Sequence, residues 1–168
     1  MFRTLALCVV LFATPAIAAD VPAKTTDFIN KAAVANRFEI DTSQLALKYA
    51  KAEDVKSFAQ QMITDHTKVG DDFKASLAEA NIEALRDSLD VTHSAKYAKL
   101  RVFTTEHSFD STYLDEQVAA HEDAVAMFKD YAANGPTPAL KSFAEKTLPS
   151  LEGHLKMVQD LRAKVPKA

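Results

Sequence analysis

Residues 53–80 read EDVKSFAQQMITDHTKVGDDFKASLAEA, and this stretch decides the fold that we expect. Its apolar side chains recur in alternating steps of four and three residues, the spacing that gathers side chains on one face of an α-helix. That face comprises Val55, Ala59, Met62, His66, Val69, Phe73 and Ser76. The pattern predicts a long amphipathic helix with a histidine in the middle of its apolar face.

The same spacing recurs along most of the chain. It predicts three further long helices, over residues 26–50, 108–134 and 138–164. Only three glycines occur in 168 residues, too few for the turns of an all-β protein, whereas alanine, leucine, lysine and glutamate are abundant and favour helix. The chain is therefore predicted to be all-α.

The connections between these stretches predict how the helices pair. The break at residues 51–52 is short enough to make an antiparallel hairpin of the first two helices, and NGPT at residues 134–137 stops the third helix and caps the fourth. Residues 81–107 are less regular and are expected to form a long crossover with a short helix around residues 94–103. Two hairpins joined by such a crossover predict one domain over residues 19–168, a ferritin-like antiparallel four-helix bundle.

The N-terminus has the layout of a secretory signal peptide. Arg3 gives it a basic start, residues 5–12 form an apolar run, and residues 16–18 (AIA) offer a cleavage site between small residues. We expect residues 1–18 to be removed, which places the mature protein in the periplasm or outside the cell. The alternative is an uncleaved N-terminal anchor, although the run is shorter than the roughly 18 residues that a spanning helix needs.

The composition argues against several classes of function. The single cysteine, Cys8, lies within the predicted signal peptide, so the mature chain can form no disulfide and offers no thiolate. The net charge is −3 at pH 7 and the basic residues are scattered, which argues against nucleic acid and against a basic membrane-binding surface. No later stretch is apolar enough to span a bilayer, and the chain carries neither a glycine-rich phosphate loop nor a G-x-S-x-G motif.

Histidines fall on the apolar faces of three predicted helices, namely His66, His121 and His154. The remaining long helix offers Glu39 on its own stripe. Counted from the two hairpin turns at about 1.5 Å of rise per residue, all four residues lie near mid-length, within about one helical turn of a common level. Neutral imidazoles and a carboxylate that converge at one level suit a divalent transition metal ion.

Other interpretations of these residues stay open. A buried histidine is often a hydrogen-bonded core residue, and Glu39 could pair with a protonated histidine without any ion. Ile29 and Ile40 define a competing apolar face on the first helix, which would turn Glu39 away from the core. Asp65 points about 100° away from its neighbour His66, and is either a hydrogen-bond partner of a ligand or an exposed carboxylate.

Five stretches together resemble a known family. They are FINKAAVANRFE (28–39), VKSFAQQMITDH (55–66), FDSTY (109–113), HEDAVAMF (121–128) and LKSFAEKTLPSLEGH (140–154). The chain is similar in these to an exported bacterial family catalogued as domain of unknown function number 4142 and grouped with ferritin-like bundles. The resemblance implies a secreted or periplasmic helical bundle, and it implies no established activity.

The histidine motifs set a limit on the ferritin comparison. Di-iron proteins of this layout use Glu-x-x-His on two helices, whereas the residues three positions before His66 and His154 are Ile63 and Leu151. No di-iron centre is therefore expected.

The leading hypothesis is an exported bundle that holds one divalent transition metal ion through His66, His121, His154 and Glu39. Its role would be metal handling or protection of the envelope against stress, and no catalytic residue is predicted. The alternative is a structural or interaction module of the envelope that binds no metal and contacts a protein partner or a second copy of itself. A weaker option is a small-molecule binder beside Pro149, which should kink the last helix.

Overall fold

The computed structural model describes residues 21–83, 88–102 and 108–165. Within those ranges the chain forms five α-helices and no strand: α1 (Ala23–Tyr49), α2 (Glu53–Glu79), α3 (Val91–Val102), α4 (Ser108–Asn134) and α5 (Pro138–Arg162). The all-α prediction is therefore confirmed. The ends of the four long helices lie within three residues of the predicted ones, and α3 begins three residues before the helix predicted in the crossover. The predicted signal peptide, residues 1–18, lies outside the described residues.

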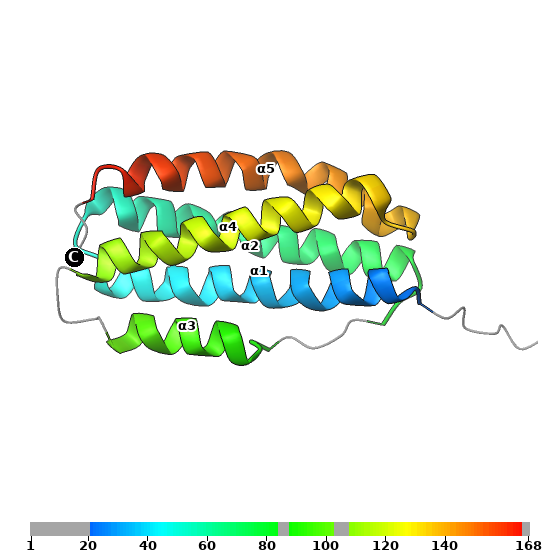
Figure 1. The fold of residues 1–168 in the computed structure, drawn as a ribbon, viewed down its shortest axis with the longest axis horizontal. Coiled ribbons are helices and arrows are strands. Elements are labelled where there is room, and N and C mark those ends of the chain that lie inside the picture. The colour runs from blue at the N-terminus through cyan, green and yellow to red at the C-terminus, as the bar shows by residue number, and fades with distance from the viewer. Residues whose placement is uncertain (1–20, 84–87, 103–107, 166–168) are drawn as a thin grey trace, which may run out of the picture.

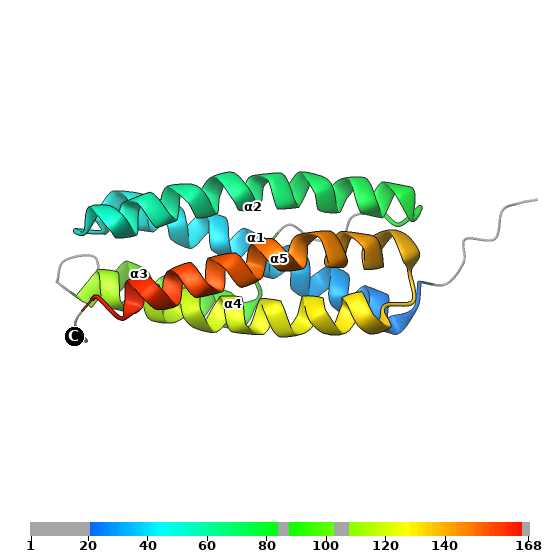
Figure 2. The ribbon, with the colours of Figure 1, turned by 90° about the horizontal axis from the view of Figure 1, so that it is seen from above.

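The four long helices pack side by side, and each contacts two others. The hairpins α1–α2 and α4–α5 make the most extensive contacts, while α1 packs on α4 and α2 packs on α5. Each long helix runs antiparallel to both of its neighbours (Figures 1 and 2). The short helix α3 lies outside this group, against α1 and α4 (Figure 1). Among the described residues, no helix is long and apolar enough to cross a bilayer.

Local sequence explains where α2 and α4 end. After α2, Asn81 adopts a left-handed φ of 55°, and the amide of Ile82 donates to the carbonyl of Leu77 at 2.9 Å, which is a Schellman ending. After α4, the chain passes so close to Tyr131 that a Cβ on Gly135 would lie 2.5 Å from it. A side chain at Gly135 is thus excluded by space, and the turn into α5 requires glycine.

The core consists of two apolar clusters separated by a polar layer. One cluster is built around Phe28, Phe128 and Tyr131, and the other around Phe58, Phe109 and Tyr113. Between them in the helix sequences lie buried polar side chains: Glu39, Thr42, His66, Gln117, His121 and His154. Because burying polar groups costs free energy unless they find partners, a layer of this size at mid-core needs a specific explanation.

Asp110 joins the two hairpins through the start of α2. The residue before that helix is Ala52, which has no side chain that could cap it. The buried carboxylate of Asp110, in the first turn of α4, accepts hydrogen bonds from the backbone amides of Lys51 and Ala52 at 2.8–3.1 Å. The carboxylate of Asp110 thus caps the positive N-terminal end of α2, although Asp110 and Ala52 are 58 residues apart in sequence.

Replacing Asp110 should therefore destabilise the fold. We expect Asp110→Ala to lower the free energy of unfolding by about 2 kcal/mol, because two half-buried backbone amides at the start of α2 lose a charged acceptor. Asp54→Ala, which removes an exposed acid from the first turn of α2 itself, is the matched control and should cost about 0.5 kcal/mol. Urea unfolding of both variants measures the difference, and equal losses would contradict this role of Asp110.

Candidate metal centre

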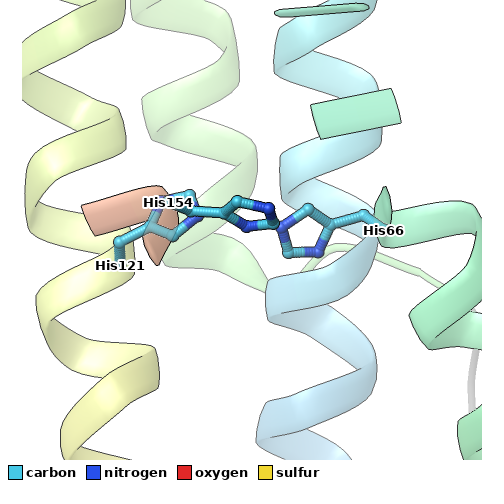
Figure 3. Close-up of side chains that lie close together, drawn as sticks. All are labelled: His66, His121 and His154. Atoms are coloured by element: carbon cyan, nitrogen blue, oxygen red, sulfur yellow. The ribbon is translucent and has the colours of Figure 1, made fainter. Parts of the chain in front are cut away.

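His66 from α2, His121 from α4 and His154 from α5 meet in the polar layer. Their side chains point toward one another (Figure 3), with ring centroids 5.5–5.8 Å apart. Each ring offers a nitrogen that lies within 4.8 Å of the nitrogens offered by the other two. All three residues are buried, with 3%, 1% and 3% of their surface exposed. The structure thus brings together all three of the histidines that the sequence singled out.

Each ring contacts an oxygen acceptor through one of its nitrogens, and in His154 that nitrogen also lies 3.5 Å from Ser150 Oγ. The nitrogen Nδ1 of His66 contacts Asn36 Oδ1 at 3.0 Å, Nδ1 of His121 contacts the carbonyl oxygen of Gln117 at 3.0 Å, and Nε2 of His154 contacts Asp65 Oδ2 at 2.9 Å. The acceptors are an amide oxygen, a backbone carbonyl and a carboxylate, none of which carries a proton to donate. The proton of each neutral ring therefore lies on these nitrogens, and the opposite nitrogen has a free lone pair.

The opposite nitrogens are left without partners. Among the described residues, His66 Nε2, His121 Nε2 and His154 Nδ1 are buried and make no hydrogen bond. An unsatisfied buried acceptor costs about 1–3 kcal/mol, and here three occur in one cluster. Metal-binding histidines have this arrangement, with one nitrogen free for the ion and the other donating to an oxygen. The donor set therefore fits one transition metal ion.

The electrostatics of the cluster favour the form of histidine that binds metal. Burial lowers the pKa of His66 well below its usual 6.5, and the neighbouring His121 and His154 lower it further. Burial also lowers the pKa of His121 and of His154, although their hydrogen bonds to Gln117 and Asp65 act in the opposite direction. The rings are thus neutral at neutral pH, and no proton competes with an ion.

Glu39 lies next to the cluster without joining it. It faces the interior with 4% of its surface exposed, so the competing face through Ile40 does not turn it outward. Its Oε1 lies 3.8 Å from Nδ1 of His121, the nitrogen already bonded to Gln117, and its Oε2 is buried without a hydrogen bond. Burial raises the pKa of Glu39 to about 8, against the lowering effect of a hydrogen bond with Gln117. Its carboxyl is therefore largely protonated at neutral pH.

A small cavity adjoins the rings. It has a volume of about 20 Å³ and is bordered by Asn36, Glu39, His66 and His121 together with apolar side chains such as Phe128. Such a volume accommodates about one water molecule. This cavity therefore has room for a ligand the size of water and none for an organic molecule.

A family described as a domain of unknown function, DUF4142, matches residues 12–161. The chain belongs to the DUF4142 family. That match includes the three histidines and all three of the residues that hold their rings. No curated protein and no solved structure gives a significant match.

Sequence reasoning missed part of this DUF4142 site. Asn36 gave no signal, since an asparagine in a helix is usually exposed, although it lies one turn before Glu39 on α1. The sequence left open whether Asp65 is a hydrogen-bond partner or an exposed carboxylate. In the structure Asp65 is hydrogen-bonded to His154 on another helix, and not to its neighbour His66. The third acceptor is the backbone carbonyl of Gln117, one turn before His121.

The raised pKa of Glu39 predicts a pH dependence of stability. Between its usual 4.5 and about 8, the folded protein keeps a proton that the unfolded chain releases, so stability falls as the pH rises. The lowered pKa values of His66, His121 and His154 act in the opposite direction up to about pH 7, because the unfolded chain takes up protons there that the folded rings do not. In metal-free protein we therefore expect the free energy of unfolding to fall from about pH 7.5 to pH 8.5 by less than about 1.4 kcal/mol per pH unit, and Glu39→Gln to remove this fall. Urea unfolding across that range, with chelator present, measures both slopes, and parallel slopes would contradict the assignment.

Gly70 explains how Asn36 fits beside His66. A Cβ on Gly70 would lie 3.1 Å from Nδ2 of Asn36, whereas a Cβ on Gly153, exposed in α5, would meet nothing within 4 Å. Gly153→Ala should therefore stabilise the protein by about 1 kcal/mol through helix propensity. Gly70→Ala should stabilise the protein by less than half of this amount, because the Asn36 amide must shift and its hydrogen bond to His66 weakens.

Thermal unfolding of the two glycine variants compares the gains, and ¹⁵N chemical shifts of the His66 ring report the bond to Asn36. Equal stabilisation by both substitutions, with the His66 shifts unchanged, would show that Gly70 is not needed for this packing.

Proposed function

We propose that this DUF4142 protein is an exported helical bundle that binds one divalent transition metal ion through His66 Nε2, His121 Nε2 and His154 Nδ1. One observation carries the proposal: three buried histidines each offer a nitrogen within 4.8 Å of the others, and in each ring one nitrogen has no partner while the other contacts an oxygen acceptor. A set of side chains that served packing alone would have no reason to leave all three lone pairs in one place.

The chemistry of the donors indicates the class of ion. Imidazole nitrogen suits zinc, copper, nickel and iron, whereas magnesium and calcium require oxygen ligands. The oxygen acceptors behind the rings increase the basicity of the free nitrogens and thereby strengthen binding. We accordingly propose zinc or one of its neighbours in the first transition series.

The order of the helices supports a ferritin-like four-helix layout, since two antiparallel hairpins are joined by a crossover that contains α3. The positions that would supply the carboxylates of a di-iron pair are occupied by Ile63 and Leu151. The proposal is therefore for a single ion. Glu39 is the nearest buried carboxyl, and we assign it a place beside the cavity, where it can hydrogen-bond to a water on the ion.

The shape of the site supports metal handling rather than conversion of an organic substrate. Three protein ligands leave a coordination position free, but the adjoining cavity of about 20 Å³ admits only a ligand the size of water. Together with the predicted export, this favours a protein that carries or buffers a metal ion in the periplasm or outside the cell, including under envelope stress.

Metal binding can be tested directly on the mature chain. After removal of metal with chelator, titration with Zn²⁺ or Co²⁺ should load about one ion per chain, and an ion at 100 times its Kd should stabilise the fold by about 2.7 kcal/mol. His121→Ala should abolish both effects. His93→Ala is the matched control, because His93 is paired with Asp90, contacts Phe38 and is not one of the three clustered histidines. Elemental analysis and thermal unfolding provide the measurements. Failure of the wild type to load metal, or loading of His121→Ala like the wild type, would overturn the proposal.

One observation favours a second candidate. A water molecule in the small cavity could satisfy Glu39 Oε2 and one or two free ring nitrogens without any ion. The histidines would then form a structural network, and the bundle would act as a module that contacts an envelope partner or a second copy. In that case the double variant His121→Ala, His154→Ala would lose stability to the same extent with chelator as with added zinc.

A further inference from the structure

An open groove lies between α2 and α5 and ends near the histidine cluster. Its volume is about 580 Å³, and its walls include Asp65, Asp72 and Glu79 on α2 and Ser142, Thr147 and Ser150 on α5. The helices α2 and α5 lie next to each other in the fold (Figure 2). Ser150 Oγ lies 3.5 Å from Nε2 of His154, so the inner end of the groove reaches the back of a cluster histidine.

The carboxylates on the α2 wall form a row. Asp65, Asp72 and Glu79 are spaced by seven residues, which is two helical turns, so they share one face of α2. Lys68 and Lys146 also border the groove, and Lys68 pairs with Asp72. The three acids exceed the two bases, and Asp65 is the member of the row that contacts a cluster histidine.

Asp65 connects the groove to the cluster. Its side chain is 35% exposed, yet its Oδ2 accepts a hydrogen bond from His154 Nε2 at 2.9 Å. The oxygen acceptors behind the other two rings are an amide and a backbone carbonyl, both uncharged. Among the three acceptors, Asp65 is thus the one that carries a negative charge, and it is in contact with solvent and a buried histidine at once.

A second groove, of about 380 Å³, lies between α1 and α2 and approaches His66. His66 itself borders this groove, beside the neutral amide of Asn36 that is bonded to its ring. Its charged lining is balanced, since Arg37 pairs with Asp41 and Lys74 lies 3.9 Å from Asp71. A cation passing through this groove would meet no carboxylate in contact with a ring, so it is the weaker candidate for a route.

We infer that the metal ion enters the cluster from the groove between α2 and α5 and that Asp65 is its transit ligand, an inference that rests on the proposed metal site. The hard, exposed carboxylate binds the hydrated ion first. The ion then moves inward to the imidazole nitrogens, which hold it more strongly. Once the ion has passed, Asp65 acts as a positioning residue that keeps the proton of His154 on Nε2 and the lone pair on Nδ1.

Adjacent acids on α2 provide a matched pair for the test, because Asp72 borders the proposed route and Asp71 borders the other groove. Each is exposed and has a lysine close by on its own helix. Stopped-flow measurement of Zn²⁺ association with the metal-free full chain, at low ionic strength, compares Asp72→Asn with Asp71→Asn. We expect the rate constant to fall about two- to fourfold for Asp72→Asn and to stay unchanged for Asp71→Asn, since a doubly charged ion senses a neutralised carboxylate along its path.

The transit role of Asp65 is tested by the same measurement. Asp65→Asn should lower the association rate constant about tenfold and also weaken equilibrium affinity by roughly 10- to 100-fold, while Asp65→Glu should restore part of the rate. If Asp65 only positioned His154, the loss would lie in the dissociation rate and association would be unchanged.

The outcomes separate this inference from the proposed function. An unchanged association rate for Asp65→Asn, equal slowing by the Asp71 and Asp72 variants, or slowing by Asp71→Asn alone would overturn the route while stoichiometric zinc binding still stood. A wild-type chain that binds no zinc at all would remove the metal site and the route together.

Discussion

The interior of this bundle must accommodate three imidazole rings where a helical protein would ordinarily place apolar side chains. Burial favours the neutral ring, and a neutral ring needs an acceptor for its N–H and a partner for its lone pair. The first requirement is met by oxygens from α1, α2 and α4. The second is met by no described residue. The division of the core into two apolar clusters follows from this polar layer.

The polar layer also ties the helices to one another. Asn36 on α1 holds His66 on α2, and Asp65 on α2 holds His154 on α5. Apolar side chains tolerate small sliding of one helix along another, whereas these hydrogen bonds have one geometry each. The layer therefore fixes the stagger of three helices, in the same way that the Asp110 carboxylate fixes the start of α2 against α4. Gly70 belongs to this arrangement as well, because a poor helix former at that position leaves space for the Asn36 amide.

Neutral ligands give the proposed centre a different charge balance from a carboxylate-rich di-iron site. A divalent ion on three imidazoles keeps its full charge inside the protein, where an uncompensated charge is costly. The nearest acidic groups are Asp65, behind His154, and Glu39, whose pKa is raised to about 8 by burial. A cation at the cluster would favour the charged form of Glu39, so binding of the ion and release of a proton would be linked. Glu39, whose burial destabilises the metal-free protein, would then stabilise the metal-bound protein.

Periodicity along single helices was enough to predict the secondary structure and the inward faces of His66, His121 and His154, and counting the rise from each turn put them at one level. These properties depend only on the geometry of each helix and the length of each hairpin. Which nitrogen of each ring is free, the pairing of Asp65 with His154, and the position of Glu39 behind His121 were decided by the tertiary structure. They depend on how far each helix is rotated about its axis and shifted along its neighbours. Those quantities are set by the packing of whole helices against one another, and no single helix encodes them.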